Sequence, residues 1–377
     1  MSGNVEFYKE LSSQIQFGFS LIRIRITKGP FVDRIKVLTV FVLIIVSCFT
    51  LLFHLSATFD GNITNNSLMT FLMLSGVLQL MLKKFSGLTI NEVVFEQLMQ
   101  WIRSLYNEVQ DDSEIKRIIS TNLQGITNFW KLAYRVVYMA TFTTSSAFLL
   151  AAMLKGEEGI IFRYPFLPLN FPLSLQLRHV LQCILTYVLS YDIVYCDISI
   201  FYIGLQLYGA ININYEIINY WNEDIQERPN VIKIIAKKHC DIITSINFFQ
   251  DVLLWLSFTH FVTSTFILLF LFTLVRTNAA AEMAIIIICF IITELFILCF
   301  FGEIIQAKME QLAETFYLTN WYDLSLEDKK AFLIILGMMQ RTYPLKAARL
   351  YDINFNSFIQ IVKMAISYCA LLVTFST

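Results

Sequence analysis

Long apolar stretches without Lys, Arg, Asp or Glu are the feature that most constrains the fold of this chain. A helix of about 20 residues crosses the hydrocarbon core of a bilayer, so an uncharged stretch of this length predicts a membrane-spanning helix. Only 15% of the residues are charged, against about 25% in typical soluble domains. The clear stretches are Val37–Phe59, Gly61–Leu82, Val136–Leu154, Val252–Val275 and Met283–Thr293, the last of which continues past Glu294 to Phe301.

Two further stretches are weaker. His179–Tyr215 is interrupted only by Asp192 and Asp197, and Met364–Thr377 is short by itself but reaches about 25 residues together with Ile353–Val362. We therefore predict an all-α membrane protein with seven transmembrane helices, near residues 36–58, 67–85, 132–155, 177–208, 248–275, 281–303 and 354–376.

The distribution of basic residues predicts the orientation of these helices, because Lys and Arg gather on the cytoplasmic side of membrane proteins. If the N-terminus is cytoplasmic, only four of the 28 basic residues fall in outer segments: Lys155, Arg163, Arg178 and Arg276. We therefore expect a cytoplasmic N-terminus and an extracellular C-terminus, the reverse of a G-protein-coupled receptor. Residues 1–34 contain no early apolar segment of a signal peptide, so the first span is expected to direct insertion itself.

Short motifs add to this topology. The sequons Asn62-Ile63-Thr64 and Asn65-Asn66-Ser67 fall in the first predicted outer loop, so Asn62 and Asn65 are candidate glycosylation sites.

The seven Cys residues lie mostly inside apolar stretches, which favours packing over disulfide bonds. The net charge of −1 gives no indication of nucleic-acid binding.

Enzymes and transporters are disfavoured by the residue patterns. The four His residues have no metal-ligand spacing, and no His–Asp or carboxylate–His pair has the spacing of a catalytic site. We therefore predict no catalytic residue, metal or cofactor. A secondary transporter would show repeated halves with Gly- or Pro-broken helices, but the spans contain almost no Pro and no internal duplication.

The predicted inner loops are also helical in pattern. Ile90–Asn128 has apolar residues at spacings of three and four, and Ile211–Asn247 and Phe301–Leu350 look similar. We expect these segments to extend the transmembrane helices into the cytoplasm and to pack together there.

The last quarter of the chain carries motifs of a known family. Glu310-Gln311-Leu312-Ala313-Glu314, Asn320-Trp321-Tyr322 and Gly337-Met338-Met339-Gln340-Arg341 resemble the third inner loop of insect odorant receptors, and Phe358–Lys363 followed by Ser367-Tyr368 resembles their last helix. Gustatory receptors carry Thr-Tyr and Gln-Phe where this chain has Ser367-Tyr368 and Thr374-Phe375, so a gustatory-type receptor is the alternative. The compact second inner loop is unlike that of the odorant receptor co-receptor, which favours a tuning, ligand-binding subunit.

The resemblance implies a non-selective cation channel that is opened by a small volatile odorant and assembled with the co-receptor as a heterotetramer. It places the subunit among lipids of the plasma membrane, in the dendrite of a sensory neuron. It also implies a single seven-helix subunit (1–377), with a ligand-binding bundle in about 1–300, a cytoplasmic anchor region in 301–353 and a pore-lining helix in 354–377. The seventh helix is then split, because an amphipathic part at about Glu327–Gln340 joins the anchor.

One face of the last helix is the candidate pore lining. Ser367, Tyr368, Leu371, Thr374 and Phe375 recur at spacings of three and four on one side. By resemblance, Leu371 corresponds to the hydrophobic gate, Thr374 to the narrowest stretch and Phe375 to the outer mouth. A hydrophobic ring closes a pore by dewetting. The alternative is that these residues only pack between helices.

A small apolar cavity among the outer halves of helices two to six is the candidate odorant pocket. Aromatic rings would contact a volatile by dispersion, and Ser and Tyr hydroxyls would orient one polar atom. Ordinary helix packing is the alternative. The candidates are Phe71, Leu74, Ser75 and Leu78 on the second helix, Phe142, Ser145, Ser146 and Leu149 on the third, Cys183, Tyr187 and Tyr191 on the fourth, and Ile287, Ile288 and Ile291 on the sixth.

Four ionisable residues inside predicted spans need an explanation, because charge is costly in a bilayer. They are Asp192, Asp197, Glu294 and Lys363. Either they face an inner vestibule, where carboxylates favour cations, or they pair between helices. The sequence leaves both roles open.

Overall fold

The computed structural model describes residues 15–23, 31–58, 65–107, 112–154, 156, 160–164, 174–222, 225, 231–276 and 281–376. Within this part the chain is mostly helical. A helical segment over residues 15–23 precedes α2 (Phe31–Thr58), α3 (Asn65–Leu88), α4 (Glu92–Asn107), α5 (Ser113–Leu154), α6 (Ser174–Trp221), α7 (Val231–Arg276), α8 (Ala281–Tyr317), η2 (Trp321–Asp323), α9 (Leu326–Met339) and α10 (Phe355–Ser376). A hairpin of β1 (Lys346–Ala347) and β2 (Tyr351–Asp352) joins α9 to α10.

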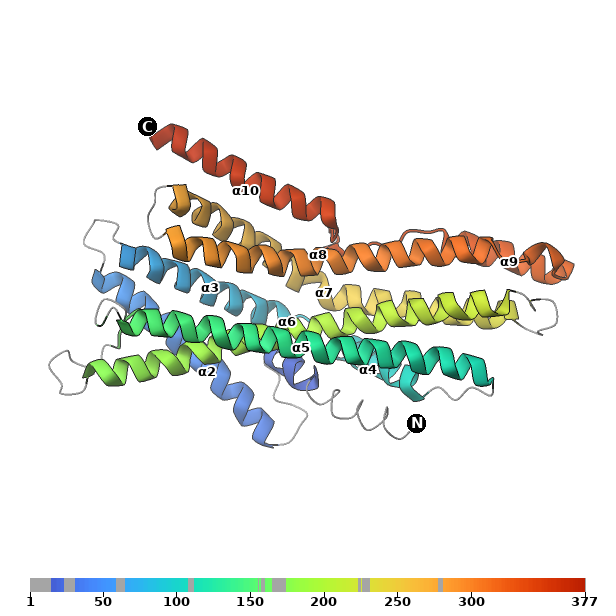
Figure 1. Cartoon of the computed structure of the whole chain (residues 1–377), viewed down its shortest axis with the longest axis horizontal. Helices are drawn as coiled ribbons and strands as arrows, with labels where there is room; N and C mark the ends of the chain where they lie inside the picture. The colour runs from blue at the N-terminus through green and yellow to red at the C-terminus, as the bar shows by residue number, and fades with distance from the viewer. Residues whose placement is uncertain are drawn as a thin grey trace.

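Four long helices, α5 to α8, run along the length of the molecule (Figure 1). They contain 42, 48, 46 and 37 residues. A helix rises about 1.5 Å per residue, so each is considerably longer than the roughly 30 Å core of a bilayer. Each helix can therefore cross a membrane and still extend into water.

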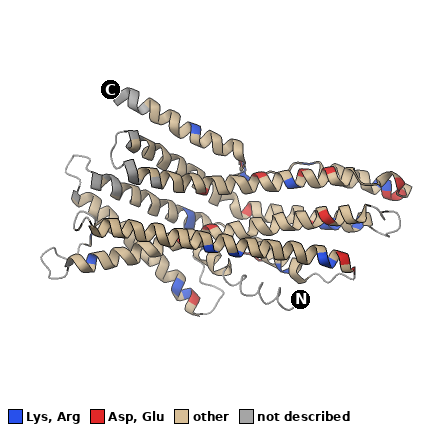
Figure 2. Ribbon diagram, in the orientation of Figure 1, with Lys and Arg blue, Asp and Glu red and all other residues tan. Residues whose placement is uncertain are grey.

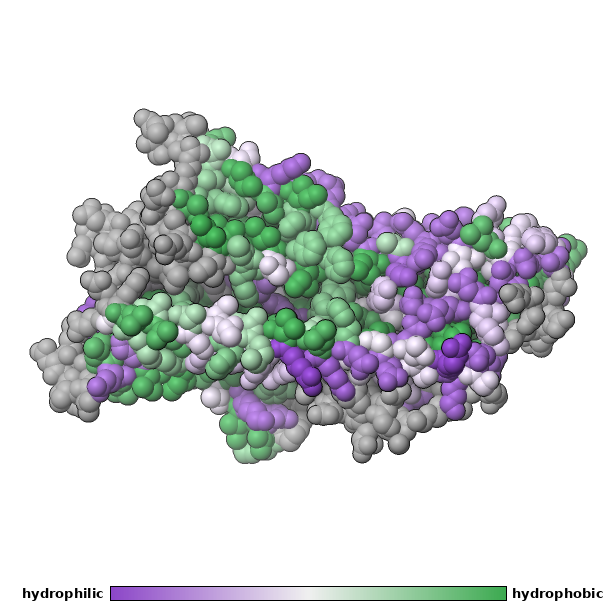
Figure 3. All heavy atoms as spheres, viewed as in Figure 1, coloured by the Kyte–Doolittle hydropathy of each residue, from purple (hydrophilic) through white to green (hydrophobic). Residues whose placement is uncertain are grey.

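The two ends of these helices differ in polarity. Charged residues gather at the end that holds α4 and α9, whereas the end that holds α3 and α10 carries few (Figure 2). The visible surface changes accordingly from hydrophilic to hydrophobic (Figure 3). We call the first the polar end (α4, η2, α9 and the adjoining halves of α5–α8) and the second the membrane end (α2, α3, α10 and the other halves of α5–α8).

Length and composition confirm the prediction of a helical membrane protein with several spans. Among the described residues, six helices are long and apolar enough to cross a membrane, and Phe355–Leu371 of α10 is a shorter apolar helix. The predicted inner loops are in fact continuations of these helices, together with α4 and α9. Asn65, which was predicted to lie in the first outer loop, is instead the first residue of α3. Asn62 and the Asn65 side chain lie outside the described part.

Polar side chains explain where several helices begin. Asn91, Asp112, Ser325 and Asn354 each accept a hydrogen bond from a backbone N–H two or three residues later, at 2.9–3.2 Å. Such a cap satisfies one of the unpaired N–H groups in the first turn of a helix. The caps start α4, α5, α9 and α10.

Two apolar clusters form the interior. The larger one fills the polar end and continues between α6, α7 and α8, and its fully buried members include Tyr202, Phe249, Phe316 and Phe332. The smaller one joins α2, α3, α6 and residues 160–164 at the membrane end. The contact between α5 and α6 at the membrane end lies largely outside both clusters.

Candidate ligand-binding site and pore helix

Aromatic and hydroxyl side chains line the contact between α5 and α6 at the membrane end. The ring of Phe142 stacks on that of Tyr187 with 6.0 Å between centroids, and the rings of Tyr138 and Tyr191 are 4.9 Å apart. The hydroxyls of Ser146 and Tyr187 are 2.8 Å apart. We call this contact the α5–α6 seam, formed by Tyr138, Phe142, Ser145, Ser146 and Leu149 of α5 with Tyr187, Ser190 and Tyr191 of α6.

Hydroxyl groups in the seam can exchange partners. Ser146 donates to the Phe142 carbonyl at 2.7 Å, so its single proton is used and Tyr187 must be the donor to Ser146. Ser145, which is buried, donates to Ser190 at 3.0 Å. An oxygen of a small ligand could therefore accept from Tyr187 in place of Ser146. The seam holds most of the predicted pocket residues of the third and fourth spans.

The other predicted pocket residues lie in different surroundings. On α3, Leu74 is buried in the smaller apolar cluster, whereas Phe71 and Leu78 are 42% and 44% exposed. Ser75 donates to the carbonyl of Leu72 in its own helix. Cys183 is half-buried on α6. On α8, Ile288 and Ile291 are buried in the larger cluster and Ile287 packs against it. Ligand binding by these positions stays a prediction.

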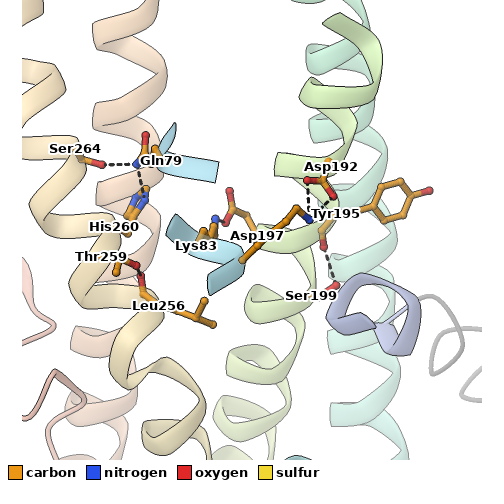
Figure 4. Close-up of polar contacts among 11 residues, drawn as sticks. Gln79, Lys83, Asp192, Tyr195, Asp197, Ser199, Leu256, Thr259, His260 and Ser264 are labelled. Atoms are coloured by element: carbon orange, nitrogen blue, oxygen red, sulfur yellow. Dashed lines mark hydrogen bonds and ion pairs between the residues drawn. The ribbon is translucent and has the colours of Figure 1, made fainter. Parts of the chain in front are cut away.

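A buried ionic cluster ties α3 to α6 (Figure 4), near the end of α3 that leads into α4. Lys84 pairs with Asp192 at 2.9 Å, and the two side chains are only 2% and 1% exposed. Lys83 pairs with Asp197. Of the two roles left open, the structure shows pairing between helices for Asp192 and Asp197, and the role of Glu294 stays a prediction.

The same face of α3 is tied to α7 by neutral groups. Gln79 lies 3.1 Å from a ring nitrogen of His260 and donates to the Ser264 hydroxyl at 3.1 Å, and Ser86 donates to Thr259 at 3.2 Å. Sequence reasoning missed this stripe because the lysines were counted with an inner loop. The sequence does contain this pattern, because Gln79, Lys83 and Ser86 recur at spacings of three and four, which place them on one face of a helix.

The last helix, α10, packs on α7 and α8 by one narrow face. Ile361, Ala365 and Cys369, which recur every four residues, are buried. Tyr368 and Leu371, which lie beside this face on the helix, are 53% and 49% exposed. The view in Figure 1 shows α10 leaning away from the bundle.

Of the remaining predicted pore residues, only Ser367 has a described side chain. Ser367 is exposed beside Tyr368, and Lys363 is exposed one turn earlier. No ion pair joins Lys363 to another residue of the described part. The side chains of Thr374 and Phe375 lie outside the described residues, although the helix itself continues to Ser376.

The hairpin between α9 and α10 is fixed to α7. The Gln250 side chain accepts from the backbone N–H of Lys346 at 2.7 Å and donates to its carbonyl at 2.5 Å, and Ala348 N–H donates to the Leu254 carbonyl at 2.9 Å. Ala348 and Arg349 have φ of 50° and 60°, a conformation that costs free energy in residues with a Cβ atom. The base of α10 is therefore held in place by tertiary contacts.

One side chain stabilises the approach to this hairpin. Tyr343 donates to the Met338 carbonyl at 3.2 Å. Burial raises the pKa of its hydroxyl, so the group remains a neutral donor in the physiological range.

Comparisons with known proteins agree with this architecture. A family model described as 7tm Odorant receptor matches residues 63–366. Two structures of the insect olfactory receptor OR5 from Machilis hrabei superpose on the chain. The structure in complex with eugenol has a TM-score of 0.73 and 16% identity, covering 97% of this chain and 99% of that chain. A second structure of the same receptor has a TM-score of 0.72 and 14% identity, covering 97% and 98%.

One curated relative shares a short segment. Odorant receptor 33b of Drosophila melanogaster is 29% identical over 80 residues, and this match spans 21% of this chain and 21% of the relative. The structural likeness supports the fold, and the family match covers most of the sequence. These related proteins are receptors and not enzymes. The chain belongs to the 7tm odorant receptor family of insects.

Proposed function

We propose that this chain is the tuning subunit of an odorant-gated, non-selective cation channel. The observation that carries the proposal is the exposed surface of α10, where Tyr368 and Leu371 lie uncovered beside the face that packs on α7 and α8. A mostly apolar helix with half of its surface uncovered fits a ring of such helices around a pore. Leu371 would then form part of a hydrophobic gate that closes by dewetting.

The proposed odorant site is the membrane end of the bundle, with the α5–α6 seam as its most complete part. The seam offers stacked aromatic rings and exchangeable hydroxyls, which suit a small volatile with one polar atom. A receptor with the same fold, OR5 of Machilis hrabei, was solved in complex with eugenol. The other predicted pocket residues of α3, α6 and α8 remain part of this proposal.

Motion of the seam would reach α10 through α7 and α8. The hairpin is fixed to α7 by Gln250, so the base of α10 stays in place while its upper part moves. The proposed division of the chain is a binding bundle in about 1–300, an anchor in 301–353 and a pore helix in 354–377.

Apolar residues exposed at the polar end, such as Leu333 and Ile334 of α9, fit contacts with other subunits in a heterotetramer with the co-receptor. The proposed orientation has the polar end and the N-terminus in the cytoplasm, and the proposed location is the plasma membrane of a sensory dendrite.

Co-expression in a cell line with and without the co-receptor tests this function. Surface labelling confirms delivery, and whole-cell currents are recorded while a panel of volatiles is applied. We expect an inward cation current with at least one volatile when both subunits are present. Full surface expression without current from any volatile, in either arrangement, would contradict the channel role.

A further inference from the structure

A cavity of about 580 Å³ lies at the polar end, between α4, α5, α6 and α7. Its walls are mostly apolar and include Trp101, Leu105, Ile213 and Ile242. It shares no residue with the α5–α6 seam or with the exposed face of α10. Its volume is within the range of about 300–1,000 Å³ that is usual for small-molecule sites, which are apolar with a few polar groups.

One buried side chain in this cavity lacks hydrogen bonds. Asn214 of α6 lines the cavity and is 1% exposed, and neither its amide nitrogen nor its amide oxygen has a partner. A buried polar group without a partner costs about 1–3 kcal/mol, so nearly all such groups are paired in folded proteins. An Asn side chain both donates and accepts, and a ligand that satisfies it must do the same.

Charged side chains line the same cavity on α7. Lys237, Lys238 and Asp241 give a net charge of about one positive unit, and Lys237 is exposed to solvent. This balance favours a ligand with a single negative charge. Because the cavity belongs to the polar end, whose visible surface is hydrophilic (Figure 3), such a ligand would enter from the aqueous side.

We propose that this cavity is a second ligand site, which takes a monoanionic amphiphile with an amide group, of the N-acyl amino acid type. The acyl chain packs against the walls around Trp101 and Ile213. The ligand amide pairs with Asn214, its N–H donating to the side-chain oxygen and its carbonyl accepting from the side-chain NH₂. The carboxylate reaches Lys237 at the edge.

The test uses the full chain in lipid nanodiscs and three soluble probes. N-octanoylglycine has the chain, the amide and the carboxylate, octanoate lacks the amide, and octanamide lacks the carboxylate. Ligand-observed NMR measures binding, and empty nanodiscs correct for partition into lipid. We expect saturable binding of N-octanoylglycine that is at least about ten-fold tighter than that of octanoate.

Three variants assign the contacts. Asn214→Leu removes the unpaired amide, so the receptor should fold at least as well as the native chain but bind N-octanoylglycine about ten-fold more weakly. Lys237→Gln should weaken N-octanoylglycine several-fold and leave octanamide unchanged. Lys233→Gln is the matched control, because Lys233 is exposed on the same helix and does not line the cavity.

Two results would overturn the proposal. One is no saturable binding of N-octanoylglycine to the native chain. The other is equal affinity of the native chain and Asn214→Leu. If Asn214→Leu does not fold, the proposal is tested by the two lysine variants alone. Equal affinities of Lys237→Gln and Lys233→Gln for N-octanoylglycine would then contradict the proposed site.

Discussion

The polar end and the membrane end of the same four helices are held together by different interactions. At the polar end, Phe332 stacks between Phe316 and Trp321, with 4.3 and 5.5 Å between ring centroids. Water surrounds this end, so apolar burial stabilises it. At the membrane end the lipid is as apolar as the side chains, so burial contributes little and helices associate through packing and hydrogen bonds.

We therefore expect the polar end to be rigid and the membrane end to rearrange when a ligand binds. Apolar side chains at the polar end interlock and have one arrangement. A hydrogen bond such as that from Tyr187 to Ser146 can instead be exchanged for a bond to a ligand at small cost. Regions that bind ligands and move are drawn from the less stable parts of a protein. The ionic cluster around Lys84 lies at the junction and joins the two ends.

Breaking the junction should have the largest effect. Asp192→Ala leaves Lys84 charged and unpaired in the interior, which costs about 3–5 kcal/mol. We expect most of the receptor to be lost from the monodisperse peak in fluorescence-detected size-exclusion chromatography. The double variant Lys84→Met, Asp192→Leu removes both charges and should recover most of the yield.

The exposed pair of Lys36 and Asp33 is the control for this experiment. Its side chains are 57% and 40% exposed, so Lys36→Ala should change stability by less than about 1 kcal/mol. Equal losses in Asp192→Ala and Lys36→Ala would mean that burial of the Lys84–Asp192 pair does not matter.

The polar end is tested next, by Phe332→Ala. Phe332 is fully buried between two rings, and its truncation should cost about 3 kcal/mol and lower the apparent melting temperature. Leu333→Ala is the matched control, because Leu333 is 58% exposed on the same helix. We expect its melting temperature to stay within error and its assembly with the co-receptor to weaken. A larger thermal effect from Leu333→Ala than from Phe332→Ala would contradict the assignment of the core.

The helices could be predicted from the sequence with more success than the contacts between them. Uncharged runs such as Val37–Phe59 and capping residues such as Ser325 act locally, so helix existence and several helix starts follow from sequence. Lys83 and Lys84 were counted with an inner loop, because their partners on α6 are more than a hundred residues away. Long-range pairing of this kind is invisible to a pattern of hydrophobicity.

The sites were partly predictable for the same reason. Spacings of three and four correctly grouped Phe142, Ser145 and Ser146 on α5, because helical geometry fixes which residues share a face. Those spacings could not show that Ile288 and Ile291 of α8 face the main apolar cluster. Nor could they find the cavity around Asn214, which is made by four helices.

The exposed side of α10 should respond with a change in gating and not in stability. Leu371→Ala makes the proposed hydrophobic ring smaller and easier to wet, so we expect a basal current several-fold above that of the native channel without odorant. Ile366→Ala is the control, since Ile366 is similarly exposed but points to another side of the helix. A basal current that rises equally in both variants would count against a gate at Leu371.

The smallest effect is expected at the seam, where the hydrogen bond between Tyr187 and Ser146 is only one of several contacts. Tyr187→Phe keeps the stacked ring and removes the donor, and this should raise the odorant concentration for half-maximal current by about two- to ten-fold, since one hydrogen bond contributes roughly 0.5–1.5 kcal/mol. An odorant that lacks an acceptor atom should be affected less than one that carries it. Thr143→Ala is the matched control, because Thr143 bonds only to carbonyls of its own helix. If Thr143→Ala shifts the response as much as Tyr187→Phe, the adaptable part of the membrane end lies elsewhere than the seam.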